Sequence, residues 1–216
     1  ATALGHLAVA ARVTSSGLAA GSVGDLVKGY SVSGWLADDS IVRALSVVED
    51  PKNWAVVSKA IRAMYLPWIE ESARHLQKIW DGEYKPQTTN IDADCILFVD
   101  GLRYDCAKRL SSHLKSGGLG VEEHSWFVPL PSVTGTGKPA VAPIVPKSNR
   151  IAETPKGYNY EPLSAYQLKK AIEDAGFVVV DGGALAAPPN SGNGKIWVEF
   201  GDIDHRGHDR GARLAM

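Results

Sequence analysis

Short apolar runs alternate with helical patterns over the last 120 or so residues of the chain. Residues 96–99 form an apolar run that is short enough for a strand buried on both faces, and a helical repeat through Cys106, Leu110 and Leu114 follows at once. Further strands are predicted over residues 124–128, 177–181 and 195–200, and a helix between Ser164 and Gly176. This order predicts an α/β fold with a largely parallel sheet flanked by helices.

The first third of the chain has helical patterning instead. Helices are predicted over residues 4–13, over residues 41–48 behind the capping residues 38–40, and from residue 53 onward, with Pro67 expected to kink or interrupt the last one. The polar, turn-rich residues 82–94 connect this region to the sheet. We therefore predict a helical region over 1–85 and a sheet domain over 86–216, with a long loop over residues 146–162.

Composition narrows the class of protein only slightly. At 216 residues and 44% hydrophobic the chain can bury a substantial core, and its formal net charge of −1 gives no overall case for binding nucleic acid or a membrane. Cys95 and Cys106 are typical of small buried hydrophobes in a reducing compartment. Since no signal-peptide pattern and no apolar run of roughly 18 residues is present, we expect a soluble cytoplasmic protein with no membrane partner.

Polar residues with compatible chemistry follow three of the predicted strands. They are Asp100 after the first, Thr134 with two glycines close behind it after the second, and Asp204 with His208 after the last. Carboxylates and imidazole bind divalent cations, and a threonine hydroxyl beside such a cation can ionise and attack. The glycines would let a phosphate approach the backbone closely.

Each of these residues also has a purely structural interpretation. Asp100 and Thr134 could cap the helices that follow them, and His205 and His208 could be ordinary surface histidines. Residues 135–138, Gly-Thr-Gly-Lys, are not a phosphate-binding P-loop, because the required earlier glycine is missing and Pro139 replaces the Ser or Thr.

Taken together, three motifs resemble the alkaline phosphatase superfamily. They are Asp-Gly-Leu-Arg-Tyr-Asp at 100–105, Pro-Ser-Val-Thr at 131–134 and Asp-x-x-Gly-His-x-x-Gly at 204–211. The last is similar to that of the nucleotide pyrophosphatase/phosphodiesterase branch. The residues of all three motifs most closely resemble those of the PglZ domain of bacterial anti-phage systems of the BREX (phage growth limitation) type, over residues 93–211.

The resemblance implies an alkaline-phosphatase-like core and a two-metal site. It assigns Asp100 as a ligand of one metal, Thr134 as the nucleophile and a ligand of that metal, and Asp204 and His208 as ligands of the other. Zinc is the first choice of metal, with manganese or magnesium as alternatives. The implied reaction is in-line attack by Thr134 on phosphorus, followed by hydrolysis of the phosphothreonine.

The sequence departs from the family pattern at its end. The family has a further Asp-His pair and a final His downstream of the last motif, whereas this chain ends at Met216. We therefore expect a fragment whose core and metal site are incomplete at the C-terminus, with weak metal binding and little activity on its own.

Two functions follow from the resemblance, and a third interpretation remains. The first is part of a metal-dependent phosphatase or phosphodiesterase of an anti-phage system, acting on a phosphoester such as a nucleotide or nucleic acid. The alternative is a catalytically inactive scaffold that binds other proteins of the defence complex. A generic nucleotide-binding domain ranks last, because no glycine fingerprint is present. Substrate and oligomeric state stay open.

Overall fold

The computed structural model describes residues 1–18, 21–80, 93–125, 133–144, 151–154, 157–160, 163–184 and 194–210. Contacts divide the chain into two compact units. The helical unit comprises Ala1–Asp81 and Arg103–Trp126, and the sheet unit comprises Gly82–Leu102 and Phe127–Met216. The helix after the first strand is therefore grouped with the N-terminal helices, although the sequence pattern had assigned it to the sheet domain. The boundary near residue 85 stays a prediction.

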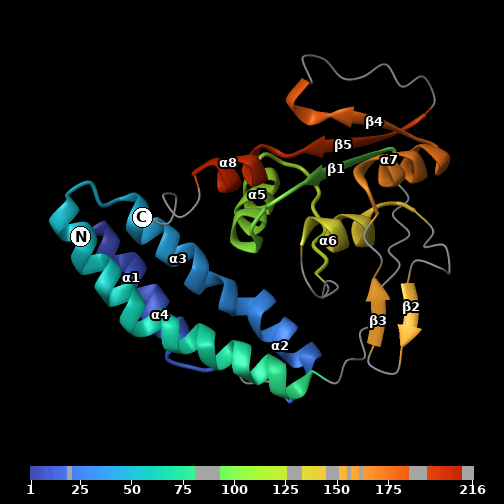
Figure 1. Ribbon diagram of the computed structural model, residues 1–216. Helices are drawn as coiled ribbons and strands as arrows, with labels where there is room; N and C mark the ends of the chain where they lie inside the picture. The colour runs from blue at the N-terminus through green and yellow to red at the C-terminus, as the bar shows by residue number, and fades with distance from the viewer. Residues whose placement is uncertain are drawn as a thin grey trace. The chain divides into compact units, whose positions relative to one another are not determined.

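The helical unit is built around a three-helix core. Its elements are α1 (Thr2–Thr14), α2 (Val23–Gly29), the π-helical turn η1 (Tyr30–Gly34), α3 (Trp35–Ser46), α4 (Pro51–Ile79) and α5 (Tyr104–Ser116). Helix α1 packs against both α3 and α4 (Figure 1). Leu7, Ala44, Val57 and Ile61 form the buried cluster between them. In the described part of the chain, no helix combines the length and the apolar content needed to cross a membrane.

Pro67 neither ends nor divides the long helix. Helix α4 runs without a break from Pro51 to Ile79, with Asp50 as its N-cap and Pro51 in the first turn, where a missing N–H costs nothing. The prediction that Pro67 interrupts the helix is therefore wrong. Val57, Ile61 and Trp68 are buried on both sides of Pro67, so tertiary packing maintains the helix past the lost hydrogen bond.

The predicted caps at residues 38–40 instead lie inside α3, where Asp39 and Ser40 are buried and Asp38 is half-buried. Asp38 accepts hydrogen bonds from the hydroxyl groups of Tyr30 and Tyr65. Burial, and then these bonds to Asp38, raise the pKa of both tyrosines well above the ordinary value. Asp39 pairs with Arg43 of its own helix at 2.8 Å and lies 3.3 Å from Arg109 Nε of α5. These contacts connect α3, α4 and α5 through polar groups.

Helix α5 buries polar positions rather than the predicted apolar stripe. Asp105, 1% exposed, and Ser111 are its buried residues, whereas Leu110 is 45% exposed. Arg103 donates to the Asp105 carboxylate at 2.9 Å, which compensates for burying that charge. Ser111, Lys108 and Lys115 all bind Glu123, which follows the helix in the chain. The hydrogen bonds from Lys108, then Lys115 and Ser111, lower the pKa of Glu123 to about 2.

Glu123 should therefore stabilise the helical unit above its ordinary pKa of 4.5, and this contribution should be lost as the pH falls through about 2. In Lys108→Met we expect the pKa of Glu123 to move back toward 4.5. Carbon-13 NMR titration of the glutamate carboxyl groups measures this, with the exposed Lys52→Met as the control. Titration of Glu123 near 4.5 in the unaltered protein would contradict the prediction.

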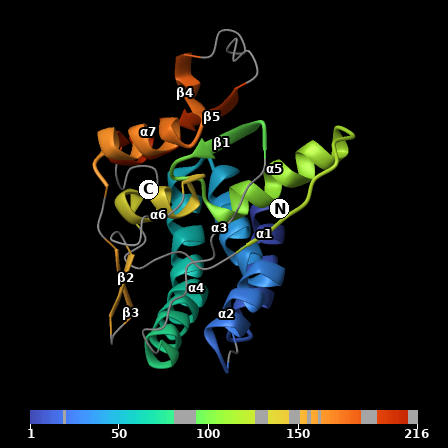
Figure 2. The ribbon, with the colours of Figure 1, turned by 90° about the vertical axis from the view of Figure 1, so that its right-hand side faces the viewer.

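The sheet unit contains a small parallel sheet with helices packed on it. Its elements are β1 (Cys95–Val99), α6 (Thr134–Val141), β2 (Ile151–Thr154), β3 (Gly157–Tyr160), α7 (Ala165–Asp174), β4 (Phe177–Asp181), the 3-10 turn η2 (Gly182–Ala184), β5 (Lys195–Phe200) and α8 (Asp202–Arg210). The strand order is β1-β5-β4, and both pairings are parallel (Figures 1 and 2). The coarse α/β class is confirmed.

One face of the sheet carries the core of this unit. Trp197 of the central strand is completely buried and stacks on Phe98 of β1, with ring centroids 5.6 Å apart. Leu168 and Ile172 of α7 and Ala142, directly after α6, pack in the same cluster. The opposite face of the sheet is less covered, since Leu97 is 59% and Val178 47% exposed. Cys95, at the start of β1, is exposed as well. The predictions that β1 is buried on both faces, and that Cys95 is buried, are therefore wrong.

Three further predictions differ from the structure. Part of the predicted loop over 146–162 is an antiparallel hairpin, in which β2 pairs with β3. The predicted strand over 124–128 lies mostly outside the described residues, and His124 and Ser125 are not in a strand. The polar segment after the last strand, for which no helix was predicted, forms α8, which has Asp202 and Asp204 in its first turn, where the helix dipole favours carboxylates.

The core of the sheet unit depends on the inner face of α7. We expect Ile172→Ala to lower the free energy of unfolding by about 2–5 kcal/mol, because Ile172 is 0% exposed and its removal leaves a cavity. Tyr166→Ala in the same helix is the matched control, since Tyr166 is 75% exposed and should cost less than about 1 kcal/mol. Urea denaturation measures both. Equal losses would show that α7 does not supply the core.

Candidate functional site

The carboxyl ends of β1 and β5 lie at the same edge of the sheet. Val99 pairs with Phe200, and the Asp100 N–H donates to the Phe200 carbonyl at 2.9 Å. Asp100 therefore follows β1 at the place where the chain leaves β5 for α8. In open α/β sheets this edge is where ligands bind. Asp100 does not cap the next helix, because the N-cap of α5 is Arg103.

A close backbone approach brings Asp204 to Asp100. Gly101 has φ +72°, and a Cβ atom at this position would lie 3.1 Å from the Asp204 nitrogen and 3.2 Å from its Cα. Only glycine fits here without strain, both for its left-handed backbone and for the space. The turn after β1 and the first turn of α8 are thus in contact, as the predicted site requires of these two aspartates.

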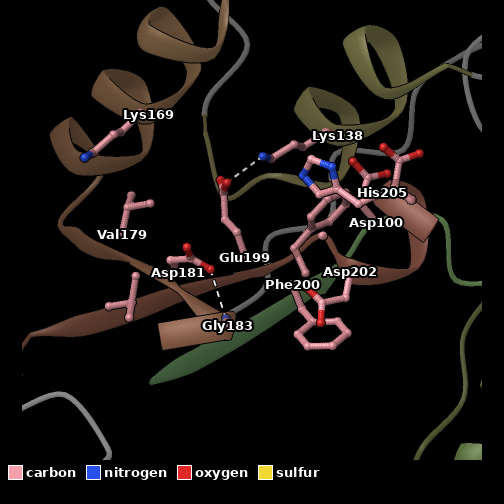
Figure 3. A pocket seen from close by; sticks show the side chains of 14 residues that line it. Asp100, Lys138, Lys169, Val179, Asp181, Gly183, Glu199, Phe200, Asp202 and His205 are labelled. Atoms are coloured by element: carbon pink, nitrogen blue, oxygen red, sulfur yellow. Dashed lines mark hydrogen bonds and ion pairs between the residues drawn. The ribbon is translucent and has the colours of Figure 1, made fainter. Parts of the chain in front are cut away.

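A pocket of about 540 Å³ opens at this edge of the sheet unit. Asp100 and Asp204 both line it, together with side chains from α6, α7, β4 and β5 (Figure 3). The lining comprises Phe98, Asp100, Lys138, Lys169, Val179, Val180, Asp181, Gly183, Glu199, Phe200, Gly201, Asp202, Asp204 and His205. The structure thus brings two of the four predicted site residues together in one pocket.

The pocket has an excess of negative charge. Its lining includes five carboxylates but only two lysines. Glu199 pairs with Lys138 at 2.7 Å, and Asp181 accepts from the Gly183 N–H at 2.9 Å. Among the described residues, the side chains of Asp100 and Asp202 have no ion-pair or hydrogen-bond partner. Such an excess of carboxylates favours a bound cation.

His208 and Thr134 occupy less direct positions. His208 Nε2 lies 3.5 Å from the Asp204 carboxylate, one turn along α8, but its side chain is 79% exposed and is not part of the lining. Thr134 is also exposed and outside the lining. It is the first residue of α6 rather than its N-cap, because the Gly137 N–H bonds to the Val133 carbonyl at 2.8 Å. Lys138, one turn later, does line the pocket.

The donor chemistry fits a divalent cation, but the number of donors is small. Carboxylate oxygens of Asp100 and Asp204 and the imidazole of His208 are ligand types that zinc, manganese and magnesium accept in different proportions. In the part of the chain that is described, no group of three or more His, Cys, Asp or Glu side chains has the geometry of a metal site. The four predicted ligands therefore stay a prediction.

Among the pocket residues that sequence reasoning did not assign to the site are Lys138 and Glu199. Glu199 interrupts the apolar residues of β5 near the carboxyl end of the strand, which was a readable signal of a functional or edge position. Lys138 gave no such signal, because its place in the pocket depends on how α6 packs on the sheet.

No family model matches the chain, and neither a curated protein nor a solved structure matches it.

The contact between Gly101 and Asp204 gives a testable consequence. Gly101→Ala should lower the free energy of unfolding by about 1–2 kcal/mol for the positive φ, and by about 1 kcal/mol or more again for crowding Asp204. Gly176→Ala is the matched control, because it has φ +90° but nothing within 4 Å of the added Cβ. Urea denaturation compares the two. Equal losses would show that the two turns do not touch.

Proposed function

We propose that the chain carries part of the catalytic centre of a metal-dependent phosphatase or phosphodiesterase of the PglZ type, within an alkaline-phosphatase-like fold. The observation that carries this proposal is the pairing of Asp100 with Asp204 in one acidic pocket at the carboxyl edge of the sheet. Two of the three motifs that resemble the family follow β1 and β5, which are adjacent strands. Phage defence as the biological role rests on the sequence resemblance alone.

The proposed site would hold divalent cations with Asp100 and Thr134 on one side and Asp204 and His208 on the other. Its two carboxylates, those of Asp100 and Asp204, come from turns that touch, and the acidic lining favours a cation. A bound cation would supply charge neutralisation and would lower the pKa of a nearby hydroxyl. The remaining ligands implied by the resemblance would follow Gly211.

In the proposed reaction Thr134 is the nucleophile. Its Oγ forms a bond to phosphorus as the bond from phosphorus to the leaving oxygen breaks, and the hydroxyl proton ends on that leaving oxygen. Water then attacks the phosphothreonine, which releases phosphate or a phosphomonoester and restores the hydroxyl. The first turn of α6 has glycine at 135 and 137, so a phosphoryl group meets little side-chain bulk beside Oγ.

One observation favours the alternative of a catalytically inactive scaffold. Thr134 is absent from the lining of the pocket that Asp100 and Asp204 share. In that case the family architecture would be kept to bind other proteins of the complex, and the acidic pocket would hold a structural cation or none.

Hydrolysis of p-nitrophenyl phosphate and of bis-p-nitrophenyl phosphate separates the two. In a protein that contains this chain and the downstream ligands, we expect turnover with zinc, manganese or magnesium that a chelator abolishes. Thr134→Ala should lower kcat by at least about 10³-fold, while Thr134→Ser retains a hydroxyl and part of the activity. The preferred ester distinguishes a phosphatase from a phosphodiesterase.

Thr136→Ala is the matched control for Thr134→Ala, because it removes a threonine hydroxyl from the same helix. A folded, metal-loaded protein without turnover would favour the scaffold. Equal losses in Thr134→Ala and Thr136→Ala would contradict the assigned nucleophile.

A further inference from the structure

Lys138 is held inside the acidic pocket by two contacts. Its Nζ lies 2.7 Å from Glu199 Oε2, and its side chain is only 18% exposed. The same ammonium group stands over the Phe98 ring, 5.4 Å from the centroid. Figure 3 shows it reaching from α6 toward Glu199 on the central strand. A lysine held in this way loses little further side-chain entropy when it binds a ligand.

Glu199 is itself fixed from the core. Its Oε1 accepts a hydrogen bond from Trp197 Nε1 at 2.9 Å, and Trp197 is completely buried. One carboxylate oxygen is thus used by the core and the other by Lys138. The ammonium group has three N–H donors, of which one ion pair to Glu199 uses one, so it retains donors for an anionic oxygen.

The second lysine of the pocket is placed differently. Lys169 lies 3.9 Å from Glu173, one turn along its own helix α7, and is 56% exposed. A surface pair of this kind contributes little and leaves the side chain mobile. Lys138 is therefore the cation of the pocket with a defined position, and Lys169 is its natural comparison.

A phosphoryl group in this pocket would lie among five carboxylates. Its negative charge would therefore need a positively charged group inside the pocket, where bulk solvent does not compensate for it. We propose that Lys138 binds a phosphoryl oxygen of the substrate, and that Glu199 positions its ammonium group. This inference rests on the proposed function, because it assumes a phosphoester ligand. Lys138 is four residues after Thr134 in α6, so the two residues lie on neighbouring turns of one side of the helix.

Binding of inorganic phosphate in the presence of magnesium tests this without turnover. We expect Lys138→Gln to weaken phosphate binding by about tenfold or more, and Lys138→Arg to stay within about threefold of the unaltered protein. Lys169→Gln, the matched control, should change it less than about threefold. Equal effects of the two Gln variants, or no phosphate binding by the unaltered protein, would overturn the proposal.

A measurement on the unaltered protein guards against a variant that fails to fold. With lysine labelled by carbon-13 at Cε, phosphate should shift the resonance of Lys138 and leave that of Lys169 in place. No shift at Lys138 at saturating phosphate would overturn the proposal.

Kinetic measurements distinguish failure of the proposed role of Lys138 from failure of the proposed catalytic function. If Thr134→Ala abolishes hydrolysis while Lys138→Gln leaves KM and phosphate binding unchanged, the function stands and the role of Lys138 is wrong. If no turnover occurs but phosphate binding still requires Lys138, the anion site stands without catalysis.

Discussion

The parallel pairing of β1 with β5 is the constraint on which the candidate site depends. The register joins Val99 to Phe200 and the Asp100 N–H to the Phe200 carbonyl, so both strands end at the same level. A slip of one residue would exchange the two faces of β1 and move Asp100 away from the start of α8. The contact of Gly101 with Asp204 has no cause within either segment alone. It exists because these two strands are neighbours.

The same register connects the core to the pocket. Phe98, Glu199 and Asp181 form one row across the three strands, and Ile96, Trp197 and Val179 form another on the same face. The row through Trp197 is apolar and packs against α7. The row through Glu199 lies nearer the carboxyl edge and contains the polar residues Glu199 and Asp181, which line the pocket. Trp197 belongs to the core through its ring and to the polar row through its N–H bond to Glu199. The packed face thus orients a charged side chain at its rim.

Local sequence patterns predicted the strands better than they predicted which strands pair with one another. The runs 95–99, 177–181 and 195–200 are rich in β-branched and aromatic residues, and this is enough to indicate strands. In the order β1-β5-β4, the pairing of β1 with β5 joins segments about a hundred residues apart, which no local pattern encodes. Helix α8 was missed because its polar residues and Gly207 suggested a loop, although Asp204 and His208 are spaced one turn apart. Asp100 and Asp204 were predicted together, but Lys138 was not.

The acidic side chains of the two units are paired to different extents. In the helical unit the buried or half-buried acids have partners: Asp38 has two tyrosine hydroxyls, Asp39 has Arg43, and Asp105 has Arg103. In the sheet unit five carboxylates share one pocket with two lysines. Three of these carboxylates have a partner, whereas the side chains of Asp100 and Asp202 have none among the described residues. Like charges without a partner cost stability, so these two carboxylates support the proposed cation. In the proposed function, a divalent cation between the turns after β1 and β5 would supply the missing positive charge, and Lys138 would bind the phosphoryl group that such a site attracts.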